Sequence, residues 1–228
     1  KPVWTCIETT HINSTVLPTP AQIRSEVWMA IIHGSRGLIY FVHEWVPSFS
    51  EPGILRYPAN MAAVTSINAQ IRDLAPVLNS PTIAGAVQVA SSNGSIPMKT
   101  MVKQYNGATY LLAVSMRSGT TTASFTLSGF SGAATVEVLG ESRTIPASNG
   151  AFSDGFTDYG VHLYKIAGSG ATLPGVTLTA TDAVASEAGG NTGTFTFTRT
   201  GSTASALTVN YTVGGAAASG VDYASIGT

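Results

Sequence analysis

The chain has 228 residues, of which 44% are hydrophobic and only 10% charged, and its formal net charge is −1. An average soluble protein carries charge on roughly a quarter of its residues, so this sequence offers no basic surface for nucleic acid and no polybasic membrane anchor. No apolar run approaches the roughly 20 residues of a transmembrane helix. Cys6 is the only cysteine, which excludes an internal disulfide and a paired-thiol metal or redox site.

The first 80 residues alternate strand and helix signals. PVWTCI, residues 2–7, is a nearly continuous apolar run, as expected of a strand buried on both faces of a parallel sheet. A helix is predicted after Pro20, because apolar residues recur at helical spacing from Ile23 to Ile31 and Gly34 marks the end. A second buried run, GLIYFVHEW at 37–45, precedes another amphipathic helix at 64–74. Strand, helix, strand and helix with short connections form the α/β pattern.

Polar and aromatic side chains follow both apolar runs. Glu8 and His11 come after the first run, and His43, Glu44 and Trp45 end the second. Because α/β sheets and barrels place their active sites at the carboxyl ends of the strands, these five residues are the candidate site.

From about residue 84 to 166 the segments become short and rich in β-branched and aromatic residues. MKTMVKQY, TYLLAVSM, TASFTLSG, ATVEVLG and GVHLYKI read as strands, and the Asn-Gly pair at 106–107 predicts a hairpin turn. This pattern predicts an antiparallel β-sandwich. Asp154 and Asp158 are interpreted as turn residues.

Residues 167–175, AGSGATLPG, read as a linker. The segment 176–228 then alternates apolar and polar residues but is shorter than the about 100 residues of a full sandwich. We therefore predict a multidomain chain with an α/β part at 1–80, a β-sandwich at 81–166, a linker at 167–175 and a partial β domain at 176–228. Strand-like sequence directly after Lys1 and an unfinished turn before Thr228 suggest a piece of a longer polypeptide.

The stretches WTCIETTHI and RSEVWMAIIHGSRGLIYFVHEW, with the helix to about residue 75, resemble the last two β/α units of TIM-barrel glycoside hydrolases of the retaining clan A type. The segment ending GAFSDGFTDYGVHLYKI resembles the C-terminal sandwich that often closes such enzymes. Together the two resemblances cover about residues 1–166. They imply a secreted bacterial enzyme that cleaves O-glycosidic bonds in a poly- or oligosaccharide and requires no cofactor.

The resemblance also implies roles for the candidate residues. Glu8 stands where the clan carries its nucleophile, at the end of strand seven, and the acid/base of strand four is expected upstream of Lys1, so that this fragment alone is expected to be inactive. Trp45 matches an aromatic that lies under the sugar ring, and His43, Glu44 and His11 are expected to contact hydroxyls or line the rim. An alternative stays open for each of them: Glu8 caps a turn or pairs with an arginine, Trp45 is an ordinary packed aromatic, His11 and His43 have structural roles, and Glu44 is a surface residue.

The last segment resembles the first half of a Calx-β motif, through SEAGG, GTFTFTRTG and LTVNYTVGGAAASGVDY. Some members of that family bind Ca²⁺ through acidic loop residues, oxygen being the ligand that this cation takes. Glu187 matches one ligand position, whereas Gly214 stands where calcium-binding members carry an acid. The calcium prediction therefore depends on Glu187 and is weakened by Gly214.

Three functions are compatible with these observations: a fragment of an extracellular glycoside hydrolase, a non-catalytic carbohydrate-binding or cell-surface adhesion protein with a barrel remnant, and a packing and spacing element. We expect the first, at the cell surface or outside the cell. An Asn-Glu pair at the end of an earlier strand would favour the enzyme.

Overall fold

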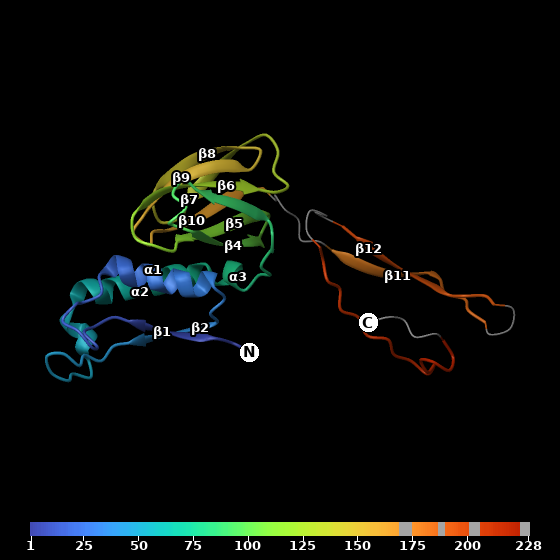
Figure 1. Cartoon of the computed structure of the whole chain (residues 1–228), viewed down its shortest axis with the longest axis horizontal. Helices are drawn as coiled ribbons and strands as arrows, with labels where there is room; N and C mark the ends of the chain where they lie inside the picture. The colour runs from blue at the N-terminus through green and yellow to red at the C-terminus, as the bar shows by residue number, and fades with distance from the viewer. Residues whose placement is uncertain (169–174, 187–189, 201–205, 224–228) are drawn as a thin grey trace. The chain divides into compact units, whose positions relative to one another are not determined.

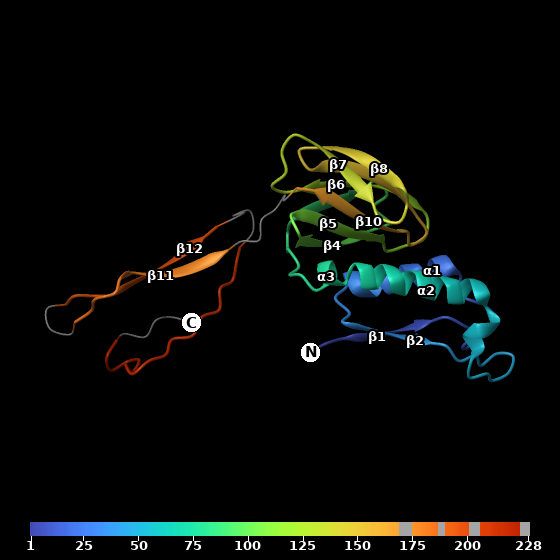
Figure 2. The same ribbon diagram turned by 180° about the vertical axis from the view of Figure 1, so that it is seen from behind.

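The computed structural model describes residues 1–168, 175–186, 190–200 and 206–223. The chain divides into two compact units, Lys1–Ala171 and Thr172–Thr228. The first unit contains a small α/β part and an eight-stranded antiparallel β domain, and the second contains a β-hairpin (Figures 1 and 2). In the described residues, no helix has the length and apolar character needed to cross a membrane.

The α/β part begins with a βαβ unit. Strands β1 (Trp4–Glu8) and β2 (Gly37–Phe41) pair in parallel, in register from Trp4↔Gly37 to Glu8↔Phe41. Helix α1 (Pro20–Ile32) connects them, and its N-terminus carries a capping box between Thr19 and Gln22, which satisfies two backbone donors reciprocally. Gly34 has a φ of +95°, the left-handed conformation that ends many helices. The predicted strand–helix–strand order is confirmed.

The segment after β2 contains three helices. They are the 3₁₀ helix η1 (Gly53–Arg56), α2 (Pro58–Asp73) and the short α3 (Ala75–Leu78). Each α-helix has a proline at its start, where the missing N–H costs no hydrogen bond. The predicted second amphipathic helix thus starts earlier than its apolar repeat, at Pro58.

The prediction that the first strand is buried on both faces is wrong. Ile7 packs against Ile23, Val27 and Ile67 of the helices, whereas the next position on the opposite face, Cys6, is exposed and Trp4 is 64% exposed. Side chains alternate between the two faces of a strand, and the described helices cover only the face of Ile7.

The β domain has eight strands in the order β3-β6-β9-β8-β7-β10-β5-β4. The strands are β3 (Val87–Ser91), β4 (Met98–Tyr105), β5 (Ala108–Ser115), β6 (Thr120–Leu127), β7 (Ala133–Val138), β8 (Arg143–Ser148), β9 (Ala151–Thr157) and β10 (Val161–Ala167). They form one hydrogen-bonded sheet that curls around a core containing Phe125, Phe152 and Tyr164, and its two edge strands lie side by side. The antiparallel β domain is confirmed, but one curled sheet replaces the predicted pair of sheets.

Two local predictions in this domain have opposite outcomes. Asn106 and Gly107 both have positive φ values, 48° and 70°, as a two-residue hairpin turn requires, and they join β4 to β5. Asp154, in contrast, lies within β9 and not in a turn. Asp158 does lie in a turn, where its carboxylate accepts a hydrogen bond from the Gly119 N–H over 2.8 Å.

Helix α1 lies between the two-stranded sheet and the β domain, as both views show (Figures 1 and 2). Ile23 and Val27 face the sheet, whereas Trp28 and Ile32 pack against side chains of β5 and β10. The helix therefore buries two faces, which explains why it has more apolar residues than one apolar stripe along a helix would need.

The second unit contains an antiparallel pair, β11 (Val176–Asp182) and β12 (Thr194–Arg199). Its apolar side chains, such as Leu178 and Phe195, are exposed, and residues 206–223 contain no helix or strand. The antiparallel pairing agrees with the expected β module, while the Calx-β assignment and the predicted domain boundaries stay predictions. Most of the predicted linker, residues 169–174, lies outside the described residues.

Candidate functional site at the carboxyl ends of β1 and β2

The segments that leave β1 and β2 remain tied together beyond the last strand pair. The Thr9 hydroxyl donates to the Phe41 carbonyl over 2.7 Å, and the Thr10 hydroxyl donates to the carbonyl of His43. Further along, the backbone N–H of Trp45 donates to the carbonyl of His11 over 2.9 Å. These bonds bring the residues after β1 next to the residues after β2, at the edge where α/β proteins place their sites.

Glu44 is the centre of the polar cluster at this edge. Its side chain is buried, with the residue 1% exposed. His11 Nδ1 lies 3.0 Å from Oε1, the Tyr57 hydroxyl donates to the same oxygen, and Arg56 Nη1 donates to Oε2 over 2.7 Å. Both carboxylate oxygens therefore have partners, as a buried charge requires.

The electrostatics of the cluster keep Glu44 ionised. Hydrogen bonds from Tyr57 and His11, assisted by Arg56, lower the pKa of Glu44 from 4.5 to about 2 despite its burial. The same contact with Glu44 raises the pKa of the Tyr57 hydroxyl. A general acid needs a pKa near the working pH, so Glu44 is a poor proton donor and a good anchor for the loops around it.

A second layer of contacts holds this anchor in place. Asn60 is buried at the start of α2, and its amide donates to the carbonyls of Thr9 and Pro18 over 3.0 and 2.9 Å. Glu44 pairs through its backbone with Ser50, with both hydrogen bonds at 2.9 Å. Gly53 approaches so closely that a Cβ there would lie 2.6 Å from the backbone nitrogen of Glu44. The loop after β2 is therefore packed against the cluster.

An aromatic group formed by His43, Trp45 and Phe49 lies on the same loop. Trp45 and Phe49 are 53% and 55% exposed, and their ring centroids are 5.0 Å apart. The His43 ring lies 6.0 Å from that of Phe49, and its Nδ1 is 2.9 Å from the carbonyl of Glu51. Exposed aromatic faces of this kind are suited to stacking against a planar or weakly polar ligand face.

Glu8 lies apart from the Glu44 cluster. It is the last residue of β1 and is half-buried, and it lines a cavity of about 410 Å³ together with Gln22, Glu26 and Tyr159. Partial burial and the negative charge of Glu8 raise the pKa of Glu26, partly offset by a hydrogen bond from the Glu8 backbone. Among the described residues, no side chain donates a hydrogen bond to the Glu8 carboxylate.

The structure thus groups some of the predicted site residues and separates others. His11 and Glu44 contact each other, and His43 and Trp45 are the neighbours of Glu44 in the loop after β2. Glu8 instead lines the cavity of about 410 Å³. The cluster also contains Arg56 and Tyr57, which sequence reasoning missed. Arg56 pairs with Glu44, and no arginine among the described residues pairs with Glu8.

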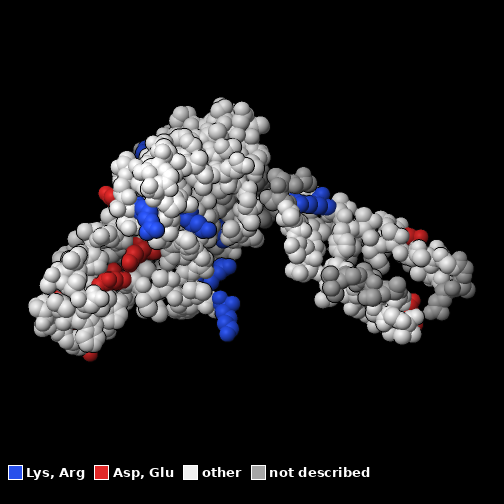
Figure 3. Space-filling view, in the orientation of Figure 1, with Lys and Arg blue, Asp and Glu red and all other residues white. Residues whose placement is uncertain are grey.

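The metal prediction is not addressed by the described part of the chain, because Glu187 lies outside it. Within the described ranges, no three His, Cys, Asp or Glu side chains are grouped so that they hold a metal ion. On the face seen in Figure 3, Lys, Arg, Asp and Glu cover little of the surface and form no broad patch of one sign.

No family model matches the sequence, and no curated protein does. Among solved structures, the chain is similar to an α-amylase from Geobacillus thermoleovorans complexed with acarbose, at 10% identity over 72% of this chain and 39% of that one, with a TM-score of 0.49. It is also similar to an Anoxybacillus α-amylase (10% identity, 75% and 39% covered, TM-score 0.48) and a GH30 endoxylanase from Clostridium papyrosolvens (13% identity, 74% and 42% covered, TM-score 0.39).

The chain thus has distant structural similarity to these glycoside hydrolases over part of its length. It spans less than half of each of those structures. At these identities and TM-scores the similarity assigns neither a family nor an activity to the chain.

Proposed function

We propose that the first unit is part of a secreted glycoside hydrolase that cleaves O-glycosidic bonds in a poly- or oligosaccharide. The observation that supports this proposal is the place of Glu8. It ends β1 in register with Phe41, which ends the parallel neighbour β2, and no described side chain donates a hydrogen bond to its carboxylate. A half-buried carboxylate at this edge of a βαβ unit is positioned as catalytic groups are in α/β proteins.

In the proposed mechanism, Glu8 is the nucleophile of a retaining reaction. Its carboxylate attacks the anomeric carbon, a second carboxyl about 5–5.5 Å away protonates the leaving oxygen, and water then hydrolyses the glycosyl-enzyme. Glu44 does not suit the acid role, because its pKa of about 2 keeps it ionised. As the resemblance implies, the proposal places the acid/base on a strand upstream of Lys1.

The aromatic group on the loop after β2 is proposed as a further contact for the substrate, outside the cavity that Glu8 lines. The exposed rings of Trp45 and Phe49 offer faces against which the apolar side of a sugar ring stacks. Glu44 holds the loop that carries both rings, because His11, Arg56 and Tyr57 all contact its carboxylate. We propose that Trp45 and His43 contact the sugar directly. Glu44 and His11 are proposed to act indirectly, by holding the loop that carries these side chains.

The test is Glu8→Gln in the full-length polypeptide that carries this unit. We expect hydrolysis to be abolished and oligosaccharide binding to be kept, because the change removes the attacking charge but not the shape. Glu137→Gln, which alters a half-exposed carboxylate on β7 outside this cavity, is the matched control and should retain turnover. Near-normal turnover in the Glu8→Gln protein would show that the nucleophile is another residue.

A second function, non-catalytic carbohydrate binding, is favoured by one observation: Trp45 and Phe49 are both more than half exposed and contact each other. A binding protein would hydrolyse no sugar as wild type and would lose retention on a polysaccharide column in Trp45→Ala and Phe49→Ala. Tyr105→Ala, an exposed aromatic at the end of β4, is the control that should leave retention unchanged.

A further inference from the structure

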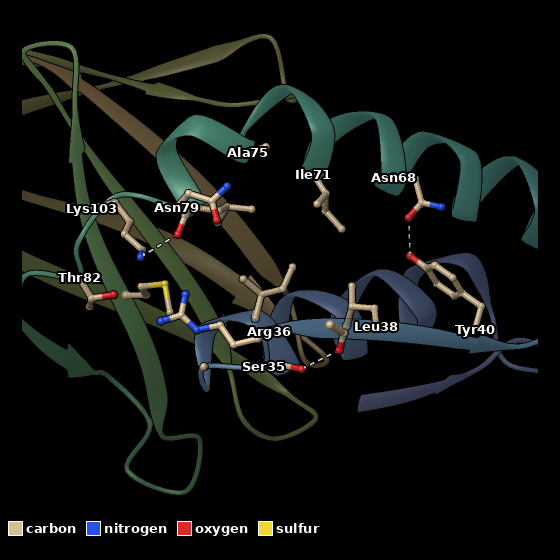
Figure 4. A pocket seen from close by; sticks show the side chains of 15 residues that line it. Ser35, Arg36, Leu38, Tyr40, Asn68, Ile71, Ala75, Asn79, Thr82 and Lys103 are labelled. Carbon is tan, nitrogen blue, oxygen red and sulfur yellow. Dashed lines mark hydrogen bonds between the residues drawn. The ribbon is translucent and has the colours of Figure 1, made fainter. Parts of the chain in front are cut away.

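A second cavity in the first unit lies at the opposite end of β2 from Phe41. Its volume is about 590 Å³, within the range of small-molecule sites, and its walls come from the start of β2, from α2 and α3 and from β4 (Figure 4). The apolar part of the wall consists of Ile31, Leu38, Ile71, Leu78 and Met101. The 15 residues that line the cavity include Arg36 and Lys103 and no Asp or Glu.

Lys103 is a buried cation, and among the described residues it has no acidic partner. The residue is 3% exposed on β4, and its ammonium group donates to the carbonyls of Leu78 and Ser80 over 3.0 and 2.7 Å. An ammonium group has three N–H donors, so one remains beyond these two bonds. Two neutral carbonyls do not neutralise the charge, and a buried charge is costly until an opposite charge compensates it.

Arg36 brings a second positive charge to the same cavity. It lies on the loop before β2, and in Figure 4 its guanidinium group extends along the cavity toward Lys103 and Thr82. Burial and the charge of Arg36 together lower the pKa of Lys103. Within the described part of the chain, no group accepts a hydrogen bond from the Arg36 guanidinium. The two cations therefore repel each other across a cavity whose described lining residues include no Asp or Glu.

We propose that this cavity binds a small carboxylate with a short apolar body. Arg36 and Lys103 donate to its oxygens, and the Leu38, Ile71 and Met101 side chains surround its hydrocarbon part. The planar fork of an arginine matches a carboxylate in two parallel hydrogen bonds, and the apolar wall favours an organic anion over an inorganic one. This site is independent of Glu8 and of the proposed hydrolase activity.

The test uses the whole chain, labelled with ¹⁵N, and follows its backbone amides by NMR during titration. Hexanoate is the probe, hexanamide its neutral counterpart, and sulfate an oxyanion without an apolar body, all at matched ionic strength. We expect hexanoate to shift amides of the cavity saturably, with a Kd on the order of millimolar for so small a ligand. Hexanamide should produce no saturable shifts, and sulfate should bind more weakly than hexanoate.

Two arginine variants separate the site from general charge effects. Arg36→Gln should weaken hexanoate binding about tenfold or more, because it removes a charge-assisted contact, and as an exposed loop residue it can be replaced without disturbing the core. Arg72→Gln is the matched control, since Arg72 is exposed and pairs with Asp73 away from the cavity. The proposal is overturned by unchanged affinity in Arg36→Gln, by equal binding of hexanamide, or by sulfate binding more tightly than hexanoate.

Discussion

His11 and Glu44 stand 33 residues apart in the chain, yet His11 Nδ1 lies 3.0 Å from Glu44 Oε1. The contact joins the segment that leaves β1 to the segment that leaves β2. Tyr57 bridges the two, since its hydroxyl also lies 2.9 Å from His11 Nδ1, and Arg56 occupies the other carboxylate oxygen. One carboxylate therefore fixes three loops at the edge where we place the site.

The first prediction concerns the acid sensitivity of this cluster. The pKa of Glu44 is lowered to about 2 from an ordinary 4.5, so the folded state binds its proton less readily than the unfolded chain. Glu44 therefore contributes stability that is fully present above pH 4.5 and is lost as the pH falls toward 2. Urea unfolding between pH 2 and 6 should show a stability difference between wild type and Glu44→Gln that is constant above pH 4.5 and shrinks as the pH falls from 4.5 toward 2.

A surface carboxylate provides the comparison for that experiment. Glu137 on β7 lies 4.0 Å from Lys165, and both side chains are about half exposed, so the pair contributes little to the stability of the fold. Glu137→Gln should therefore follow the wild-type pH dependence. A wild-type minus Glu44→Gln difference that stays constant from pH 2 to 6 would contradict the role given to Glu44.

The second prediction tests the leading cause of that low pKa. The hydrogen bond from Tyr57 is the largest contribution, so Tyr57→Phe should raise the pKa of Glu44 toward its ordinary 4.5. The side-chain carboxyl carbon of Glu44, followed by ¹³C NMR against pH, reports the midpoint directly. Tyr40→Phe, which removes a hydroxyl bonded to Asn68, should leave the midpoint where it is. An unchanged titration midpoint in Tyr57→Phe would show that His11 and Arg56 alone are enough to keep the pKa of Glu44 low.

Sequence periodicity was enough to predict the βαβ unit, because apolar spacing and Pro and Gly signals all agree there. It could not show that Trp4 and Cys6 are exposed, since an apolar run alone does not say which layers cover a strand. Arg56 and Tyr57 were not predicted as site residues, because they lie at the end of a one-turn helix that is too short to show a periodic pattern. A usable signal was their position directly before Pro58, at a helix start facing the strand ends.

Strand β9 was missed for a different physical reason. Phe152, Asp154 and Phe156 occupy alternate positions of one strand face, and a carboxylate between two core aromatics breaks the expected pattern. Its charge is compensated by Arg143 on β8, a partner that strand alternation does not reveal. Pairing between neighbouring strands, not local composition, makes this sequence a strand.

The third prediction concerns the junction between α1 and the β domain. Trp28 is fully buried against β5 and β10, so Trp28→Ala should destabilise the unit by about 3–5 kcal/mol. Its Nε1 is buried without a hydrogen-bond partner among the described residues. Trp28→Phe keeps much of the packing and removes that unpaired donor, so it should cost about 1 kcal/mol or less. Urea denaturation followed by far-UV circular dichroism measures the free energy of unfolding of both variants. An equal loss of stability in Trp28→Ala and Trp28→Phe would contradict the importance given to packing.

The last prediction concerns the ion pair inside the β domain. Arg143 donates to both oxygens of Asp154, over 3.1 and 2.7 Å, and the Tyr164 hydroxyl donates over 2.9 Å. Although burial opposes it, these bonds lower the pKa of Asp154 below its ordinary 3.8. Because the Arg143 side chain is 35% exposed, solvent screens the pair, and Asp154→Asn should cost about 1–2 kcal/mol at pH 7.

The pH dependence of this variant identifies the charge as the cause. A carboxyl with a lowered pKa stabilises the fold above pH 3.8 and loses that contribution as acid protonates it, so the cost of Asp154→Asn should shrink below that pH. Asp73→Asn, in a mostly exposed pair with Arg72, should change stability by less than about 0.5 kcal/mol. If both variants cost the same in urea at pH 7, then Arg143 and Asp154 do not compensate each other's burial, and the polar position in the middle of β9 needs another explanation.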